Sequence, residues 1–157
     1  MDGFSHVNEQ GLPTMVDVGE KRISQRRAVA RSIVELPPIV YEKLINGDIV
    51  TKKGSVFQTA IIAGIMAAKK TGELIPLCHP LGLENCSIDI SVSNNNLVID
   101  CTARITSKTG VEMEALVGAT IAALTVYDMC KSLSHDIIIK ETKLMEKSGG
   151  LHEYKRT

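Results

Sequence analysis

The segment GVEMEALVGATIAALTVYDMCK, residues 110–131, decides how the rest of the chain folds. It carries no charge between Glu114 and Asp128 and is rich in Ala, Val, Ile and Leu, which is typical of a buried helix. Its ends differ from its middle. Glu112 and Glu114 fall in the first turn, while Asp128 and Lys131 lie three residues apart on neighbouring positions of one face. We expect the middle of the helix to form core and its ends to carry chemistry.

Two alternating segments precede this helix. In CSIDISVS (86–93) and LVIDCTARI (97–105), apolar and polar residues alternate, and the asparagines at 94–96 supply a turn. This pattern predicts a β-hairpin with one buried and one solvated face.

The flanking segments complete the order of elements. QRRAVARSIVEL (25–36) alternates and predicts a strand, which the prolines at 37 and 38 end. A short helix over 39–47 follows, then a helix from residue 56 capped by Ser55, and the run 136–150 gives the last strand. The apolar face expected on the second helix consists of Val56, Ile61, Ile62, Ile65 and Met66. The resulting βαββαβ order predicts an α+β fold, an antiparallel sheet with helices packed on one face.

Composition limits the classes of partner. Lys plus Arg and Asp plus Glu each number 18, so no overall field favours nucleic acid or an anionic membrane. Two Phe and three Tyr are too few for a base-stacking platform. We expect no apolar run to approach the ~20 residues that span a bilayer. We expect one soluble, cytoplasmic domain over 1–157, with residues 1–20 an irregular arm that has room for one edge strand.

The thiols and the apolar helix give two further expectations. The four cysteines lack CxxC spacing, so buried reduced thiols are a better interpretation than a zinc site. The apolar residues of the long helix extend round the cylinder, which predicts that a second subunit covers part of it and that the protein is a homo-oligomer. They are Ala115, Leu116, Ala119, Ala122, Ala123 and Val126.

The residues alone leave the candidate chemistry open. Lys53 lies just before a helix N-terminus, where an anion binds well, although solvated lysines are the simpler explanation. For His79, between Cys78 and Pro80, structural and functional roles are evenly balanced. Spacing alone makes Asp128 and Lys131 a helix ion pair rather than a base and an acid. Glu114 and Asp128, ~21 Å apart along the axis, cannot reach one reacting atom.

Seven segments, in order along nearly the whole chain, resemble the molybdenum cofactor biosynthesis protein C family of cyclic pyranopterin monophosphate synthases. They are MVDV (15–18), Arg26, KG (53–54), IPLCHPL (75–81), KTGVEMEAL (108–116), LTVYDMCK (124–131) and KSGG (147–150). The resemblance implies a ferredoxin-like fold and a cytoplasmic homohexamer built as a trimer of dimers. It also implies a lyase that rearranges a cyclic dihydroguanosine triphosphate derivative to cyclic pyranopterin monophosphate and releases diphosphate.

The same resemblance assigns roles to residues. It implies that Asp128 is the catalytic acid/base with Lys131 as its partner. The implied substrate-binding residues, including those for the triphosphate, are Arg26, Lys53, Leu77, Cys78, His79, Lys108, Glu112, Met113, Glu114 and Lys147. Cations beside a departing diphosphate and positioned proton donors and acceptors fit this chemistry.

One position departs from the family pattern, since Ser55 stands where the family often has Asp after KG; both residues cap helices. We expect no cofactor and no metal site of the chain's own, with magnesium entering only in company with the substrate phosphates. A noncatalytic nucleotide-sensing module and a structural oligomerisation domain are the two rival functions.

Overall fold

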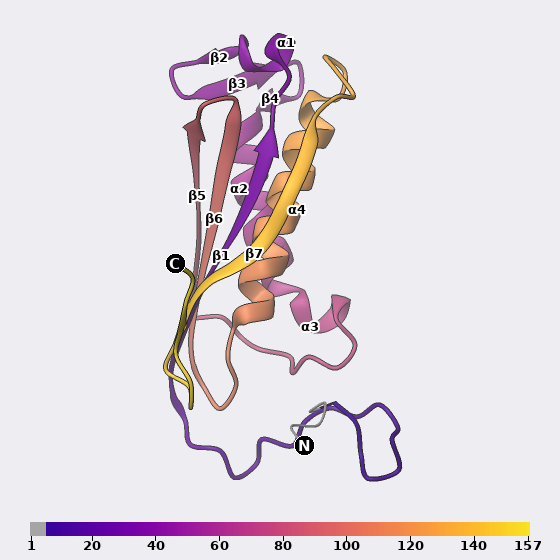
Figure 1. Cartoon of the computed structure of the whole chain (residues 1–157), viewed down its shortest axis with the longest axis vertical. Coiled ribbons are helices and arrows are strands. Elements are labelled where there is room, and N and C mark those ends of the chain that lie inside the picture. The colour runs from indigo at the N-terminus through magenta and orange to yellow at the C-terminus, as the bar shows by residue number, and fades with distance from the viewer. Residues whose placement is uncertain (1–5) are drawn as a thin grey trace.

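Four long strands form the centre of the fold in the computed structural model, which describes residues 6–157. They are β1 (Ser24–Glu35), β5 (Asn85–Ser93), β6 (Asn96–Ser107) and β7 (Ile138–Ser148), and the short β8 (Tyr154–Lys155) joins the edge. The order is β5-β6-β1-β7-β8, and every pair is antiparallel. The predicted ferredoxin-like α+β fold is confirmed, and Figure 1 shows the strands running along the length of the molecule.

The predicted alternation decides which face of each strand is buried. On β1, Ala28, Ala30, Ser32 and Val34 are fully buried against the helices. The opposite face carries charge: Arg31, directly across from Asp100 on β6, binds its carboxylate with two hydrogen bonds of 2.7 Å. The hairpin predicted from 86–105 forms as β5 and β6, with Asn94 at positive φ in its turn.

Two helices, α2 (Val56–Lys69) and α4 (Glu112–Cys130), cover one face of the sheet (Figure 1). They pack closely because each has a glycine at the crossing. A Cβ on Gly64 would lie 2.7 Å from the carbonyl oxygen of Gly118, and one on Gly118 would lie 2.6 Å from Sγ of Cys101. The backbones of α2 and α4 are therefore in close contact at this crossing.

This close packing corrects two predictions from the sequence. The buried face of α2 consists of Val56, Phe57, Ala60, Gly64, Ala67 and Ala68. Ile62 and Met66, expected in the core, are 60% and 51% exposed. On α4, five of the six residues expected to need a second subunit are already buried within the chain, because α2 and the sheet together surround them. The apolar circumference of α4 therefore does not itself argue for an oligomer.

A small three-stranded sheet caps one end of the molecule and was missed in the sequence. The helix predicted over 39–47 is only α1 (Pro38–Tyr41), and β2 (Leu44–Ile45), β3 (Asp48–Thr51) and β4 (Gly54–Ser55) follow. Asn46 and Gly47, both at positive φ, form the β2–β3 turn, so Gly47 ends a hairpin rather than a helix. A further short helix, α3 (Thr71–Leu74), follows α2.

The N-terminal arm contains no regular strand in its described part. Residues 1–5 of the predicted arm lie outside the described residues, and 15–18 form no strand; an isolated bridge joins Val7 to Pro13 instead. By length and composition α4 could cross a membrane, although its uncharged run covers only residues 115–127. Half of its most apolar window is buried inside the chain, as in the core helix of a folded domain.

Candidate active site

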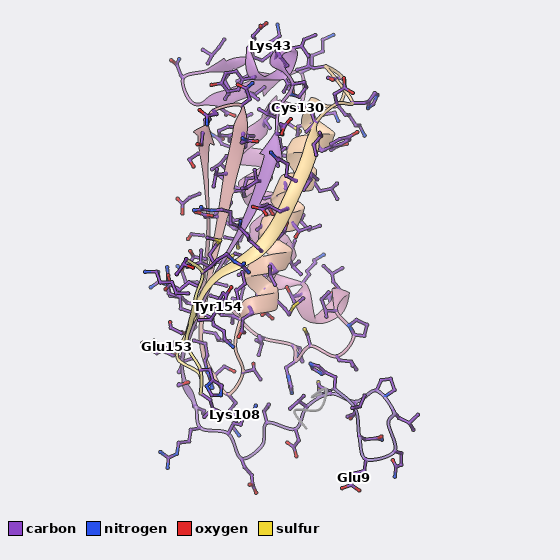
Figure 2. The ribbon with its side chains drawn as sticks, viewed as in Figure 1. Glu9, Lys43, Lys108, Cys130, Glu153 and Tyr154 are labelled. Carbon is purple, nitrogen blue, oxygen red and sulfur yellow. The ribbon has the colours of Figure 1, made fainter. Side chains whose placement is uncertain are left out.

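The residues singled out in the sequence gather in two places, at opposite ends of α4. Figure 2 shows this separation: Cys130, at the C-terminal end of α4, lies beside the small sheet, whereas Lys108, just before α4, lies at the other end of the molecule. The helix rises 1.5 Å per residue, so the two ends are ~20 Å apart or more.

The C-terminal end of α4 carries a carboxylate between two ammonium groups, which we call the acid–lysine cluster (Lys53, Asp128 and Lys131). Nζ of Lys131 lies 2.8 Å from Oδ1 of Asp128, and Nζ of Lys53 lies 3.2 Å from Oδ2. Lys53 also donates to the backbone carbonyl of Asp128 at 3.4 Å. All three side chains are about half exposed, so the ion pairs are open to solvent in the single chain.

The small sheet holds Lys53 in this position. Asp48 on β3 accepts hydrogen bonds from the hydroxyl of Ser55 and from the backbone N–H of Phe57 at 3.0 Å. Ser55 then accepts from the N–H of Gln58 at 3.1 Å, so the predicted N-cap is confirmed and a second acidic residue supports it. Asp48 therefore supplies a carboxylate beside Ser55 at the start of α2.

The two ammonium groups set the protonation state of the cluster. Hydrogen bonds from Lys131 and then Lys53 lower the pKa of Asp128, and the charges of the same two lysines lower it further. The hydrogen bond with Asp128 in turn raises the pKa of Lys131. Both shifts favour the charged forms, an ionised carboxylate and a protonated amine, and each also makes its group a weaker base or a weaker acid.

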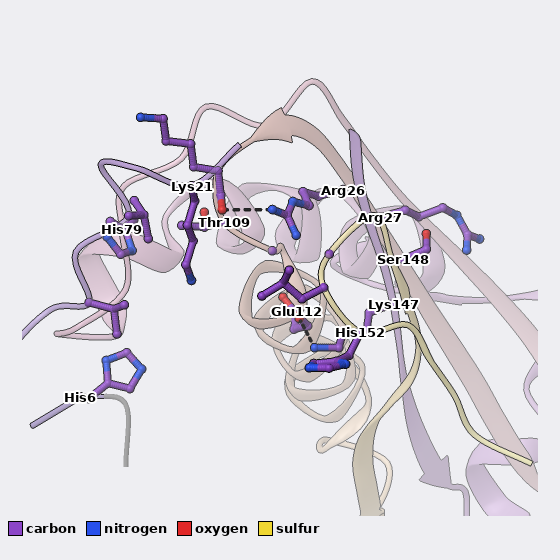
Figure 3. A pocket seen from close by; sticks show the side chains of 16 residues that line it. His6, Lys21, Arg26, Arg27, His79, Thr109, Glu112, Lys147, Ser148 and His152 are labelled. Atoms are coloured by element: carbon purple, nitrogen blue, oxygen red, sulfur yellow. Dashed lines mark hydrogen bonds and ion pairs between the residues drawn. The ribbon is translucent and has the colours of Figure 1, made fainter. Parts of the chain in front are cut away.

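At the other end of α4 the surface is hollowed into a cavity of about 350 Å³, which we call the basic cavity. Its lining brings together segments far apart in the sequence. Among the predicted site residues, Arg26, His79, Lys108, Glu112 and Lys147 line it, and Lys21, His6 and His152 join them. Figure 3 shows Lys147 and Glu112 pointing toward one another, while Arg27 extends away from the group.

Specific contacts hold the cations of this cavity. Lys147 pairs with Glu112 at 3.1 Å, and Lys108 donates from Nζ to the carbonyl oxygen of Gly19 on the arm. Arg26 donates to the carbonyl oxygens of Ser107 and Lys108, at 3.4 and 3.2 Å. These partners are single carboxylates or carbonyls, so each cation retains donors for an anionic ligand.

The two glycines of KSGG bring the end of β7 against β1. Gly149 has a φ of +88°, and a Cβ there would collide with the carbonyl oxygen of Gln25. A Cβ on Gly150 would lie 2.6 Å from Nη1 of Arg26. Glycine is therefore required at 149, where the obstacle is backbone, whereas at 150 the Arg26 side chain could shift to accommodate a Cβ.

A smaller hollow of about 110 Å³ adjoins the basic cavity and shares His79 and Glu112 with it; we call it the niche. The remaining predicted binding residues line it: Leu77, Cys78, Met113 and Glu114. Glu114 is only 3% exposed, and this burial raises the pKa of its carboxyl, with a smaller contribution from the charge of Glu112. Burial, followed by the charge of Glu114, also raises the pKa of Cys78. The niche is thus an apolar recess with a carboxyl biased toward its neutral form.

The sequence predicted residues at both ends of α4 but missed several that lie beside them. Lys21 and His152 line the basic cavity, and Asp48 organises the loop of Lys53. Lys21 lies in the most basic stretch of the chain, which was a usable signal. His152 follows the glycines after the last predicted strand, where no pattern marked it. Over residues 6–157, no group of three or more His, Cys, Asp or Glu side chains is arranged to hold a metal ion.

Comparison with known proteins assigns the chain to a family. Residues 15–150, which include both ends of α4 and the four long strands, match the MoaC family. The chain belongs to the MoaC family. The fold, the acid–lysine cluster, the basic cavity and the niche are therefore those of a MoaC chain.

Several curated relatives of this MoaC chain are about half identical to it. A cyclic pyranopterin monophosphate synthase of Xanthomonas campestris is 50% identical over 94% of this chain and 90% of its own length. Molybdenum cofactor biosynthesis protein 1 of Dictyostelium discoideum is 50% identical, and a molybdenum cofactor biosynthesis bifunctional protein of Synechocystis is 49% identical. The chain spans 26% of the first of these two longer proteins and 46% of the second.

Proposed function

We propose that this chain is a cyclic pyranopterin monophosphate synthase of molybdenum cofactor biosynthesis, a phosphorus–oxygen lyase. Its substrate is (8S)-3',8-cyclo-7,8-dihydroguanosine 5'-triphosphate, which it rearranges to cyclic pyranopterin monophosphate with release of diphosphate. One observation carries the proposal: every residue to which the resemblance gives a role lies in the basic cavity, the niche or the acid–lysine cluster.

The basic cavity suits the triphosphate of such a substrate, and the niche suits its ring system. A cavity of about 350 Å³ is within the usual size range of small-molecule sites. Lys147, Arg26 and Lys108 offer ammonium and guanidinium donors to the phosphates and to the charge that grows on the departing diphosphate. In the niche, burial favours the protonated form of the Glu114 carboxyl, and in that form it can donate a hydrogen bond to a ring nitrogen or carbonyl oxygen.

The acid–lysine cluster supplies the proton transfers. Ring opening and reclosure require a base and an acid near the reacting atoms. Asp128 is held ionised and serves as the base, and Lys131 is held protonated and serves as the acid. Lys53 keeps Asp128 in place and adds positive charge on its other side.

A complete site needs a second copy of the chain. Glu114 and Asp128 lie ~21 Å apart along one helix. A substrate whose purine-derived ring lies against Glu114 therefore cannot place its reacting atoms beside Asp128 of the same chain. We therefore assign the active enzyme to a homo-oligomer, a hexamer built as a trimer of dimers, in which the niche of one copy faces the acid–lysine cluster of another. No cofactor is assigned to it, and magnesium would enter only with the substrate phosphates.

Direct assay tests the activity. Purified chain is incubated with the cyclic triphosphate, and diphosphate and the pterin product are quantified together. Both products should appear in equal amounts and be lost in Asp128→Asn. Tight binding of the triphosphate without turnover would instead identify a nucleotide-sensing module.

Mixing inactive variants tests the shared site. Asp128→Asn disables the acid–lysine cluster, and Glu114→Ala disables the niche. In a mixed oligomer some sites receive both intact halves, so the mixture should regain about a quarter of wild-type activity if a site takes its halves from two copies. A mixture as inactive as its components would show that both halves come from one copy.

A further inference from the structure

We propose that Cys86 and Cys101 form a redox-active dithiol, which a hydroperoxide oxidises to a disulfide within the chain. The pair lies on the hairpin, outside both clusters of the candidate active site. Its Sγ atoms are 3.9 Å apart, and neither cysteine has a role in the proposed reaction.

The register of the hairpin brings the two thiols together. Cys86 on β5 lies opposite Ala103, and Cys101 on β6 lies opposite Ile88, so the two cysteines are diagonal neighbours on the helix-facing side. A disulfide requires the sulfur atoms to approach to ~2.05 Å. Because β5 is the edge strand, it can twist toward β6 to close this gap without breaking a second strand pairing.

The two thiols differ in exposure, which assigns their roles. Cys101 is fully buried, whereas Cys86 is only partly buried and can be reached by a small oxidant. Hydrogen bonding with Cys101 lowers the pKa of Cys86, and the ammonium of Lys69 lowers it further against the opposing effect of burial. Hydrogen bonding to Cys86 and burial raise the pKa of Cys101. Cys86 is therefore the attacking thiolate and Cys101 the thiol that resolves the intermediate.

The reaction proceeds in two balanced steps. The Cys86 thiolate attacks one oxygen of hydrogen peroxide and the O–O bond breaks; the released hydroxide takes up a proton, leaving Cys86 sulfenic acid and water. Sγ of Cys101 then attacks the sulfenic sulfur, loses its proton and displaces a second water as the disulfide forms. Overall, two thiols are oxidised and one peroxide is reduced to two waters.

The other two cysteines provide internal controls. Burial raises the pKa of Cys130 to about 11, with a smaller contribution from Asp48. The pKa of Cys78 is also raised, chiefly by burial. Both thiols should thus react with peroxide more slowly than Cys86, by about tenfold or more.

Peptide mapping of the full chain tests the proposal. Cys78, Cys86 and Cys101 share one tryptic peptide, so the oxidised protein is cleaved instead at Glu84, Asp89 and Asp100, which separates all three. After peroxide, the Cys86 and Cys101 fragments should be joined by a bond that dithiothreitol reverses. A joined pair formed between two chains, or fragments that both remain alkylatable while Cys78 is oxidised, would overturn the proposal.

Two variants sharpen the assignment without altering the candidate active site. In Cys101→Ala, the sulfenic acid of Cys86 should persist and be trapped by dimedone. In Cys86→Ser, Cys101 should remain reduced at the same peroxide dose. Oxidation of Cys101 in Cys86→Ser at the wild-type rate would contradict the order of attack. Should Cys101→Ala fail to fold, the wild-type peptide map and Cys86→Ser still decide the question.

Discussion

Lys53, in the turn between β3 and β4, lies 3.2 Å from the carboxylate of Asp128 on α4, 75 residues further along the chain. This contact ties the small sheet to the C-terminal end of the long helix. It also places Asp128 between two ammonium groups, since Lys131 approaches from the other side. Exposed ion pairs of this kind contribute little to folding.

Replacing Asp128 should separate activity from stability. Asp128→Asn preserves the shape of the side chain but removes the base, so kcat should fall by about 10²- to 10⁴-fold. The midpoint of urea unfolding should change little because the ion pairs are exposed. Glu141→Gln, which breaks the comparable exposed pair with Lys143, is the matched control and should leave kcat unchanged. Equal losses of kcat in both variants would rule out a special role for Asp128.

Removing a cation from the basic cavity should weaken binding of the triphosphate. Lys147→Ala deletes one charge-assisted contact, and kcat/KM should fall by about 10- to 100-fold. Lys143→Ala removes a lysine from the same strand, outside the cavity, and serves as the control. The difference between wild type and Lys147→Ala should diminish at high salt, because salt screens the attraction of either protein for the triphosphate. A loss that is identical in the two variants would point to general charge rather than to the cavity.

The buried carboxyl of Glu114 should make stability depend on pH. Its pKa is raised in the folded chain, so between the ordinary glutamate value and the raised value the folded state binds more protons than the unfolded state. The free energy of unfolding should therefore fall as pH rises through this window and level off above it. In Glu114→Gln, which cannot ionise, that fall should be smaller. Urea unfolding at a series of pH values measures it, and parallel curves for the two proteins would refute the assignment.

The glycine crossing should not tolerate a methyl group. Gly64→Ala would force a Cβ to within 2.7 Å of the carbonyl oxygen of Gly118, and the resulting overpacking should destabilise the chain by about 1–3 kcal/mol. At Gly82 an added methyl group would have no atom within 4 Å, and the backbone there has no positive φ. Gly82→Ala should therefore be neutral or slightly stabilising. Chemical denaturation of both variants gives the comparison, and a neutral Gly64→Ala would show that the helices can move apart freely.

Local pattern was sufficient for the central sheet and the long helix. The hairpin and β1 followed from alternation, because one face of each strand is buried and the other is not. The small sheet was missed because Leu44 and Ile45 form a strand of only two residues, too short for any period to show. The face predicted for α2 was right for Val56, which is buried, and wrong for Ile62 and Met66, which are exposed. The helix packs mainly on α4, and Gly64 at that crossing gives no hydrophobic signal.

The geometry of the candidate site could likewise be predicted only in part from the sequence. The distance between Glu114 and Asp128 followed from helical rise alone. The contact of Lys53 with Asp128 did not, because it depends on how the small sheet docks on α4. Apart from the family resemblance, the expectation of an oligomer rested on six apolar residues of α4, five of which the chain buries by itself. The separation of the two clusters is now the better argument for it.

The packing of α4 along its whole length also limits how such an enzyme can move. The buried residues between Glu114 and Cys130 are locked between α2 and the sheet, and a segment so packed opens only when most of the domain unfolds. The helix is therefore rigid, and the distance between its two ends should stay constant while a ligand binds and leaves. Movement around a ligand bound at either end would therefore have to come from segments outside this helix, and hydrogen exchange along the chain would show which of them open more readily.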